Sequence, residues 1–413
     1  MPSVDRLSVL PDNIISHILS FLPIKISVST SILARRWRFV WVHFPNLDFD
    51  NIYCKYGTGL SDIIDTVMSN PRLQSINTFR LRCRHSRLKE NKVEKWLAGH
   101  SINILIISPN LMRVLPRAIF TCKTLVELRL TSGVLPSFSG EDISFPRLKK
   151  LHLMVVQFET DENLPKLLCY CPVLDHLSID GCLAGNYYIS SPTIKMLKFS
   201  PRSSASSNHE VGIDAPALEY LQLWVCTTSH VSTCALTSLV EADIAIYHPS
   251  CHEDETYRLS VLDFVNRLCK VKRLKLSINV PLPCRIRSIS RFDNCTRLGL
   301  NDPRLLMKIL ERADNLEVLV LFRGYSYHGF WEEPEQVPRC LLSRLAMVRI
   351  DEFDCRESEF STVRYFLKNA EVLKRMEVHT TKYIDLDLAM KLNALQKIAL
   401  FKRGSKECEL ALS

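Results

Sequence analysis

One short stretch of the sequence concentrates basic side chains that could bind an anion. Arg80, Arg82 and Arg84 alternate along a predicted strand, so their guanidinium groups leave the same face of it. Arg87 and Lys89 follow directly after this strand. Like charges this close repel one another, and arginine pairs well with phosphate and carboxylate oxygens. Two interpretations stay open: an anionic partner, or a solvated face that counterions screen.

Motifs for covalent chemistry or metal binding are missing from the sequence. There is no Gly-rich phosphate loop, GxSxG, HExxH or paired-carboxylate motif, and only 12 glycines could build such loops. Cys169-x-Cys171 followed by Cys182 has no CxxC pair or spaced histidines to complete a zinc site. The sequence therefore predicts a protein that is not an enzyme and has no metal and no cofactor. An anionic small molecule would suit the arginine cluster, but no motif supports it.

The 15 cysteines do not have the spacing of a disulfide framework. Cys122 and Cys171 each lie six positions before a leucine of a predicted strand, at a place where Ala215 stands in another copy of the same pattern. A cysteine that alternates with alanine fills a small buried slot. We therefore expect free thiols in a reducing compartment.

From about residue 75 onward the sequence repeats one pattern, LxxLxL, which we call the phrase. Fourteen copies can be identified, and their ends are separated by about 25 residues, within the range of leucine-rich repeats. Clear copies end at Leu130, Leu153, Ile179, Leu223 and Leu321, and weaker copies end at Leu81, Ile107, Phe199, Ile244, Leu276, Leu300, Ile350, Val378 and Leu400.

The phrase predicts a solenoid. In xLxL the two apolar residues point to one side of a strand and the residues between them point to the other. One such strand cannot bury its apolar side alone, but stacked copies form a parallel sheet with a continuous core. Unrelated α/β strands with crossover helices are the alternative, and most segments between the phrases lack a helical pattern. We therefore expect an α/β solenoid with the parallel sheet on its concave face.

The residues between the leucines should form the concave face, where such proteins commonly bind a ligand. Tyr220 and Trp224 share one face of one predicted strand, and exposed aromatic residues are good anchors for a partner. Arg80, Arg82 and Arg129 lie at equivalent positions of other copies. These five residues are the predicted substrate-binding residues. A solvated face without a ligand is the alternative.

The first fifty residues have a different pattern. Leu10-Pro11-Asp12 predicts the start of a helix, because proline is tolerated in the first helical turn. Ile14, Ile15, Ile18, Leu19 and Leu22 follow at helical spacing, and two further short helical segments extend to Phe44. Three short helices cannot bury this much apolar surface without help. The surplus indicates a partner protein, with a helical subdomain packed only on its own chain as the alternative.

This segment resembles the F-box of large plant protein families. The matching residues are Leu10-Pro11-Asp12, Ile14, Ile15, Ile18-Leu19-Ser20-Phe21-Leu22-Pro23, Lys25, Thr30-Ser31, Leu33, Arg36-Trp37-Arg38, Trp41 and Leu47-Asp48-Phe49-Asp50. The resemblance implies docking to the adaptor Skp1, and through Skp1 to a cullin. The implied docking face consists of Leu10, Pro11, Ile14, Ile18, Leu22, Pro23, Val28, Leu33 and Trp37. Ile24, Ile26 and Ser27 depart from the family pattern, and Ser27 is expected to weaken the packing of the second helix.

The last part of the chain, from Trp331, resembles the FBD module that accompanies plant F-box and leucine-rich-repeat proteins. The matching residues are Trp331, Pro334, Val337-Pro338, Cys340-Leu341, Glu359, Tyr365-Phe366-Leu367-Lys368-Asn369-Ala370, Val372-Leu373-Lys374, Met376, Arg403-Gly404-Ser405 and Cys408. Helical spacing of Phe360, Val363 and Phe366 predicts a helix before a strand at Met376 and Val378. We expect the module to cap the last repeat.

Composition narrows the partners. The formal net charge of +9 is modest and spread along the chain, without the basic helix or aromatic-interleaved patch of a nucleic-acid-binding protein. No signal peptide and no apolar run long enough to span a membrane are present. We expect an intracellular protein of the nucleus, the cytoplasm or both, with no nucleic-acid or membrane partner.

Together the resemblances imply three parts: an F-box at 1–50, leucine-rich repeats at 51–330, and the FBD module with C-terminal repeats at 331–413. The implied function is the substrate-recognition subunit of an SCF-type (Skp1-cullin-F-box) E3 ubiquitin ligase, whose solenoid binds an unknown target protein. The alternative is a Skp1-binding or ligand-sensing interaction protein without ligase output. Neither function requires a catalytic residue in this chain.

Overall fold

The computed structural model divides into two compact units, which we call the N-terminal unit (1–194 and 200–202) and the C-terminal unit (195–199 and 203–413). It describes residues 9–412 except 20, 23, 33–34, 36, 38–39, 41–45, 51–59, 74, 84–89, 110–113, 139–142, 183–184, 202–209, 227–229, 235, 248–254, 281, 283–288, 323–332, 335 and 382–387.

The N-terminal unit begins with short helices and continues as a parallel sheet with strand order β1-β2-β3-β4-β5-β6. The helices before the sheet are α1 (Asp12–Leu19), α2 (Ile24–Ser29) and the 3-10 turn η1 (Thr30–Ile32). The strands are β1 (Asn46–Asp50), β2 (Ser75–Cys83), β3 (Ser101–Pro109), β4 (Glu127–Leu135), β5 (Lys150–Phe158) and β6 (His176–Asp180), with β7 (Tyr187–Ser190) outside this order. The connecting helices are α3 (Leu60–Met68), α4 (Glu90–Leu97), η4 (Arg117–Ile119) and α5 (Asn163–Cys169).

The C-terminal unit repeats the same construction with strand order β8-β10-β12-β13-β14-β15-β16-β17-β18, and every described pairing is parallel. These strands are β8 (Met196–Ser200), β10 (Tyr220–Cys226), β12 (Glu241–Tyr247), β13 (Arg273–Asn279), β14 (Arg297–Leu300), β15 (Val318–Leu321), β16 (Met347–Phe353), β17 (Arg375–Thr380) and β18 (Glu409–Leu412). A smaller parallel pair is formed by β9 (Glu210–Asp214) and β11 (His230–Thr233). The helices are α6 (Glu255–Arg267), α7 (Pro303–Leu310), α8 (Arg339–Ser343), α9 (Glu357–Asn369) and α10 (Leu388–Ala399).

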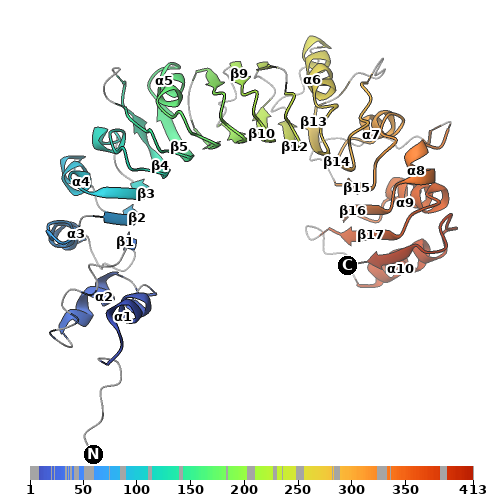
Figure 1. Cartoon of the computed structure of the whole chain (residues 1–413). Coiled ribbons are helices and arrows are strands. Elements are labelled where there is room, and N and C mark those ends of the chain that lie inside the picture. The colour runs from blue at the N-terminus through green and yellow to red at the C-terminus, as the bar shows by residue number, and fades with distance from the viewer. Residues whose placement is uncertain are drawn as a thin grey trace, which may run out of the picture. The chain divides into compact units, whose positions relative to one another are not determined.

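Within each unit the helices that connect the strands lie on one side of the sheet, whereas α1 and α2 lie beyond its edge at β1 (Figure 1). The repeated leucines point to that side and form the core. In the C-terminal unit, for example, Leu274, Leu298 and Leu319 are aligned in register on three strands and are buried. We call the opposite side of each sheet the open face. The parallel sheet with its aligned leucines confirms the predicted α/β solenoid.

Thirteen of the fourteen predicted phrase ends lie in strands of these sheets, and the last one is wrong. Leu400 directly follows helix α10 and is 86% exposed. The residues before it, Leu395 and Ile398, are also spaced as on a helix, and short apolar runs fit both patterns. The final strand is β18 instead, and β1, which pairs with β2, is a strand that the phrase did not predict.

The predicted helix of the last module is confirmed as α9, whose buried side includes Phe360, Val363 and Phe366. The Glu359 carboxylate accepts hydrogen bonds from the backbone N–H groups of Arg356 (2.9 Å) and Asp354 (3.0 Å). These bonds use donors at the start of the helix that have no partner inside it. The helix is followed by β17, in which Met376 and Val378 are buried as expected.

The cysteines whose side chains the structure describes carry free thiols. Cys171 is buried as predicted, and burial raises the pKa of its thiol to about 12. Cys122 is only half-buried. No helix in the described ranges is both long and apolar enough to cross a membrane.

Candidate functional site

Helix α1 has apolar residues on two sides. Ile15 and Leu19 are buried on the inner side, against the chain itself. On the outer side, Ile14 is 42%, Ile18 is 41% and Leu22, just beyond the helix, is 39% exposed. These three residues follow one another at four-residue steps, so they form a stripe on one side of the helix. We call Ile14, Ile18 and Leu22 the apolar stripe.

Further large apolar side chains are exposed in the same segment: Val9, Phe21, Ile26 and Ile32. None of them is among the residues that the sequence predicts for the docking face. Phe21 is one of the residues that match the F-box pattern, and Ile26 departs from it; the apolar character of each residue within this segment is the signal that could have identified them. Exposed apolar clusters of this kind mark interaction surfaces in proteins that are otherwise well packed.

The other predicted docking residues have different surroundings. Leu10 is half-buried and Pro11 is exposed. Trp37 is 7% exposed, so it supports the segment from within and offers little surface. Pro23, Leu33 and the side chain of Val28 lie outside the described part, as does most of the predicted third helix.

Ser27 does not leave a packing defect in the second helix. Its side chain is fully buried, and its hydroxyl donates a hydrogen bond to the carbonyl of Leu19 over 3.1 Å. The hydroxyl thus has a partner at the end of α1, as a buried polar group requires. The bond joins the start of the helical segment to α2.

The arginines of β2 face carboxylates on the neighbouring strand. Arg80 pairs with Asp48 (3.0 Å), and Arg82 pairs with Asp48 (3.3 Å) and Asp50 (3.1 Å). All four side chains lie on the open face of β1 and β2, which are aligned in register. The repulsion between the arginines is therefore relieved inside the chain. Arg84, Arg87 and Lys89 of the predicted cluster lie outside the described residues.

Arg129 lies on the open face of the N-terminal unit, where it forms an ion pair with Glu127. His152 is its neighbour in register on β5, and its ring lies 3.9 Å from the same carboxylate. Burial, aided by the charge of Arg129, lowers the pKa of His152 below its usual range. This cluster is thus largely satisfied by its own charges.

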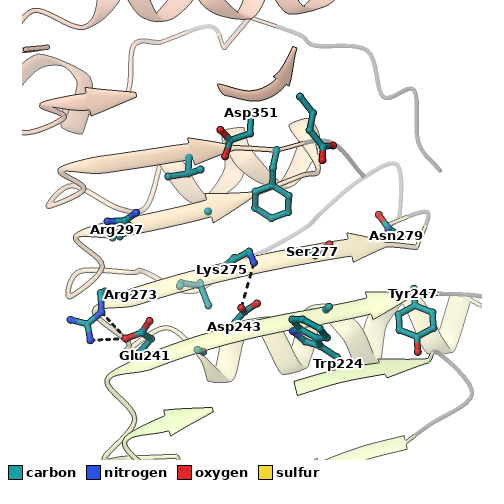
Figure 2. A pocket seen from close by; sticks show the side chains of 17 residues that line it. Trp224, Glu241, Asp243, Tyr247, Arg273, Lys275, Ser277, Asn279, Arg297 and Asp351 are labelled. Carbon is teal, nitrogen blue, oxygen red and sulfur yellow. Dashed lines mark hydrogen bonds and ion pairs between the residues drawn. The ribbon is translucent and has the colours of Figure 1, made fainter. Parts of the chain in front are cut away.

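The open face of the C-terminal unit contains a cavity of about 960 Å³ (Figure 2). Trp224 lines it, as the prediction for the concave face implies, and is 40% exposed. Tyr220, at the start of the same strand, is half-buried, and burial together with Asp243 and Glu241 raises the pKa of its hydroxyl. Other lining residues are aromatic (Tyr247, Phe322), charged (Glu241, Asp243, Arg273, Lys275, Arg297, Asp351, Glu352) or apolar (Val320).

Small residues form the floor of the cavity. Trp224, Ala245 and Ser277 are aligned in register on β10, β12 and β13, so a large side chain at one position is followed by two small ones. Gly299 lies two residues before the corresponding position on β14. The cavity exists because residues on four strands combine, and no single repeat shows it in the sequence.

Most charges around the cavity form internal ion pairs. The Arg273 guanidinium donates to Glu241 over 2.8 and 2.6 Å, and the Lys275 ammonium lies 3.4 Å from Asp243 (Figure 2). Asp351 accepts from Arg349 over 2.7 Å. In the described part of the chain, no group of three or more His, Cys, Asp or Glu residues could hold a metal ion.

Known protein families and proteins have sequences similar to this chain. Residues 99–243 match a family described as FBD-associated F-box protein At5g56370, LRR repeats, and residues 332–378 match the family described as FBD. The F-box/LRR-repeat protein At4g14103 of Arabidopsis thaliana is 32% identical over 354 residues, which cover 78% of this chain and 92% of that protein. The putative FBD-associated F-box protein At5g53635 of the same plant is 30% identical, and the match covers 98% of this chain and 99% of that protein.

Proposed function

Because the chain belongs to the family of plant F-box proteins with leucine-rich repeats and an FBD module, we propose that it is the substrate-recognition subunit of an SCF-type ubiquitin ligase. Its F-box segment docks Skp1, and through Skp1 a cullin. Its solenoid binds the target protein. The chain acts as an adaptor and performs no covalent step.

The observation that carries this proposal is the apolar stripe. Apolar residues on two sides of a helix favour burial of both sides. The inner side of α1 is covered by the chain itself, whereas Ile14 and Ile18 are exposed on the outer side. A groove on a partner protein can take an amphipathic helix through residues at such four-residue steps. Skp1 is the partner that the family implies.

The mechanism is proximity. A ligase transfers ubiquitin faster to a protein that is held near the loaded conjugating enzyme, because tethering raises the effective concentration of the two reactants. The open faces of the two units offer the surface on which a target can be held. Trp224, with its exposed indole, is the predicted anchor residue that lines a cavity there.

Co-purification tests this function. We expect the full chain, expressed with Skp1 and a cullin, to be recovered together with both proteins, and a captured target to receive ubiquitin when the remaining ligase components are added. Recovery with Skp1 and cullin but without ubiquitin transfer to any captured protein would favour the alternative, an interaction or sensing protein without ligase output. No recovery of Skp1 would refute the ligase function and the Skp1-binding form of the alternative, and would leave a ligand-sensing protein.

A further inference from the structure

The cavity of the C-terminal unit is built around a contact between a cation and an aromatic ring. The ammonium group of Lys275 lies 5.6 Å from the centre of the Phe322 ring. Gly299 permits this approach: a Cβ at its position would lie 3.2 Å from the side chain of Lys275 and 3.4 Å from that of Phe322. The contact shows that this ring attracts a cation, and Lys275 already supplies one. Trp224 and Tyr247 are the other aromatic residues of the lining.

The charges of the lining residues do not cancel locally. Glu241 and Asp243 are paired with Arg273 and Lys275, and Asp351 is paired with Arg349 outside the cavity. Among the described lining residues, Glu352 is the carboxylate that forms no ion pair, and Arg297 is the cation that forms none. The two residues lie at opposite ends of the strands. Arg297 is the first residue of β14, whereas Glu352 lies two residues beyond Ile350, which is aligned with the last residues of β14 and β15.

A bulge in β16 contains two acidic residues that line the cavity. The pairing of β16 with β17 shifts between Ile350 and Phe353: two residues of β16, Asp351 and Glu352, stand opposite one residue of β17, His379, so β16 has one extra residue here. Glu352 adopts a left-handed backbone conformation with φ of 58°, which is unfavourable for a residue with a side chain. Bulges and such strained residues are frequent beside binding sites.

The aromatic residues lie at the same end of the cavity as these carboxylates. Phe322 and Asp351 directly follow Leu321 and Ile350, which are aligned in register. Lys275, Gly299 and Val320 are aligned in one row across three strands. Two residues further along these strands lie Ser277 and Phe322, and Ser277 is aligned with Ala245 and Trp224. Phe322 and Trp224 therefore lie at the same level of the sheet. Figure 2 shows Arg297 at the opposite end of the cavity from Tyr247. An anion attracted to Arg297 would therefore not contact the aromatic rings.

We propose that this cavity binds an arginine or lysine side chain of the target protein, between the aromatic rings and the carboxylates of the β16 bulge. The proposal rests on the proposed function, because it names the chemistry of the substrate. A side chain of a polypeptide fits better than a free amine, since a cavity of about 960 Å³ also has room for the neighbouring backbone. Charge complementarity at Glu352 and the exposed ring of Trp224 select the basic side chain over a neutral one.

Retention of peptide pools on the immobilised full chain tests the proposal. Each pool has one fixed central residue (Arg, Lys, Gln, Glu or Phe) and random flanks without charged or aromatic residues. The Arg- and Lys-centred pools should be retained about tenfold more strongly than the Gln-centred pool, which corresponds to roughly 1.4 kcal/mol. The net charge of +9 works against non-specific retention of basic peptides, so a preference for them requires a local site.

Three variants locate the site. Glu352→Asn removes the charge with a residue that tolerates the left-handed conformation, and it should abolish the preference for basic pools. Trp224→Ala should do the same, and Arg344→Gln, which removes an exposed cation of the same unit outside the cavity lining, should leave the preference unchanged. Melting temperatures confirm that each variant is folded, and if Trp224→Ala is not, Glu352→Asn decides.

Equal retention of all pools, stronger retention of the Glu- or Phe-centred pool, or an undiminished basic preference in Glu352→Asn would overturn the proposal. Skp1 binding is measured on the same immobilised chain. Skp1 binding without a basic preference rejects the cavity proposal alone. A basic preference without Skp1 binding rejects the receptor function and leaves the cavity as a site for basic side chains.

Discussion

Two cysteines separated by one residue have different surroundings. Cys169, the last residue of α5, is exposed, whereas Cys171 is buried and its thiol donates a hydrogen bond to the carbonyl of Leu167 over 3.2 Å. Burial raises the pKa of the Cys171 thiol to about 12. Only the thiolate reacts readily with alkylating agents. The Cys171 thiol therefore remains protonated and protected at neutral pH.

We expect iodoacetamide to alkylate Cys169 in the native protein and to spare Cys171, as measured by mass spectrometry of the digested chain. Both cysteines should react after unfolding in denaturant, which controls for the reagent. Equal labelling of the two residues in the folded chain would show that Cys171 is accessible and that the described packing of α5 is wrong.

The arginines of β2 illustrate what the sequence can predict for single residues. Alternation along a strand correctly places Arg80 and Arg82 on one face. Their partners Asp48 and Asp50 were not predicted, because residues 47–50 were interpreted as the end of the F-box pattern and not as a strand. These ion pairs join residues about thirty positions apart, on two strands. Which residues face each other depends on the register between the strands, and a local sequence pattern gives no information about that register.

At the scale of elements, periodicity succeeds where burial is one-sided. The LxxLxL phrase identifies strands because two leucines must face a core in every repeat, and Leu128, Leu151 and Leu177 are aligned and buried as this requires. It fails at Leu400, where a helix of the last module has the same local spacing. The β16 bulge could not be predicted either, since the register shift at Asp351 and Glu352 and the left-handed backbone of Glu352 leave no mark in the local sequence pattern.

Gly404 fixes the end of the chain to helix α9. Its N–H donates to the carbonyl of Leu367 over 2.7 Å, and a Cβ at this position would lie 2.6 Å from the carbonyl oxygen of Lys368. Because the obstacle is backbone, it cannot move aside as a side chain would. We expect Gly404→Ala to lower the free energy of unfolding by about 1–3 kcal/mol, measured by denaturant unfolding.

The matched control for Gly404 is Lys402→Ala, which changes an exposed residue two positions earlier. It should leave the stability unchanged. If Gly404→Ala is as stable as this control, the close approach between the final segment and α9 does not exist in solution.

At the scale of the whole molecule, the family and the solenoid follow from the sequence, but only part of the binding surfaces does. Ile14, Ile18 and Leu22 were predicted and are exposed, whereas Trp37 is buried. Trp224 was predicted as an anchor, but its cavity was not. The cavity requires small residues at matching positions on separate strands, and it becomes visible only when the register of β10, β12, β13 and β14 is known.

The central claim is that the outer side of α1 docks Skp1. The direct measurement is the affinity of the full chain for Skp1, by titration calorimetry, for the wild type and for Ile14→Asp combined with Ile18→Asp. Both residues are exposed, so the change leaves the buried side of α1, Ile15 and Leu19, intact. Leu259→Asp is the control for a charge placed elsewhere, since it puts one aspartate on an exposed leucine of α6 in the other unit.

Charging two apolar anchors of a desolvated interface should cost about 2–4 kcal/mol, which weakens binding roughly 30- to 900-fold. We expect this loss for the double variant, an unchanged melting temperature, and wild-type affinity for Leu259→Asp. Wild-type affinity in a folded Ile14→Asp, Ile18→Asp variant would contradict the account, because the apolar stripe would then not be the surface that Skp1 covers.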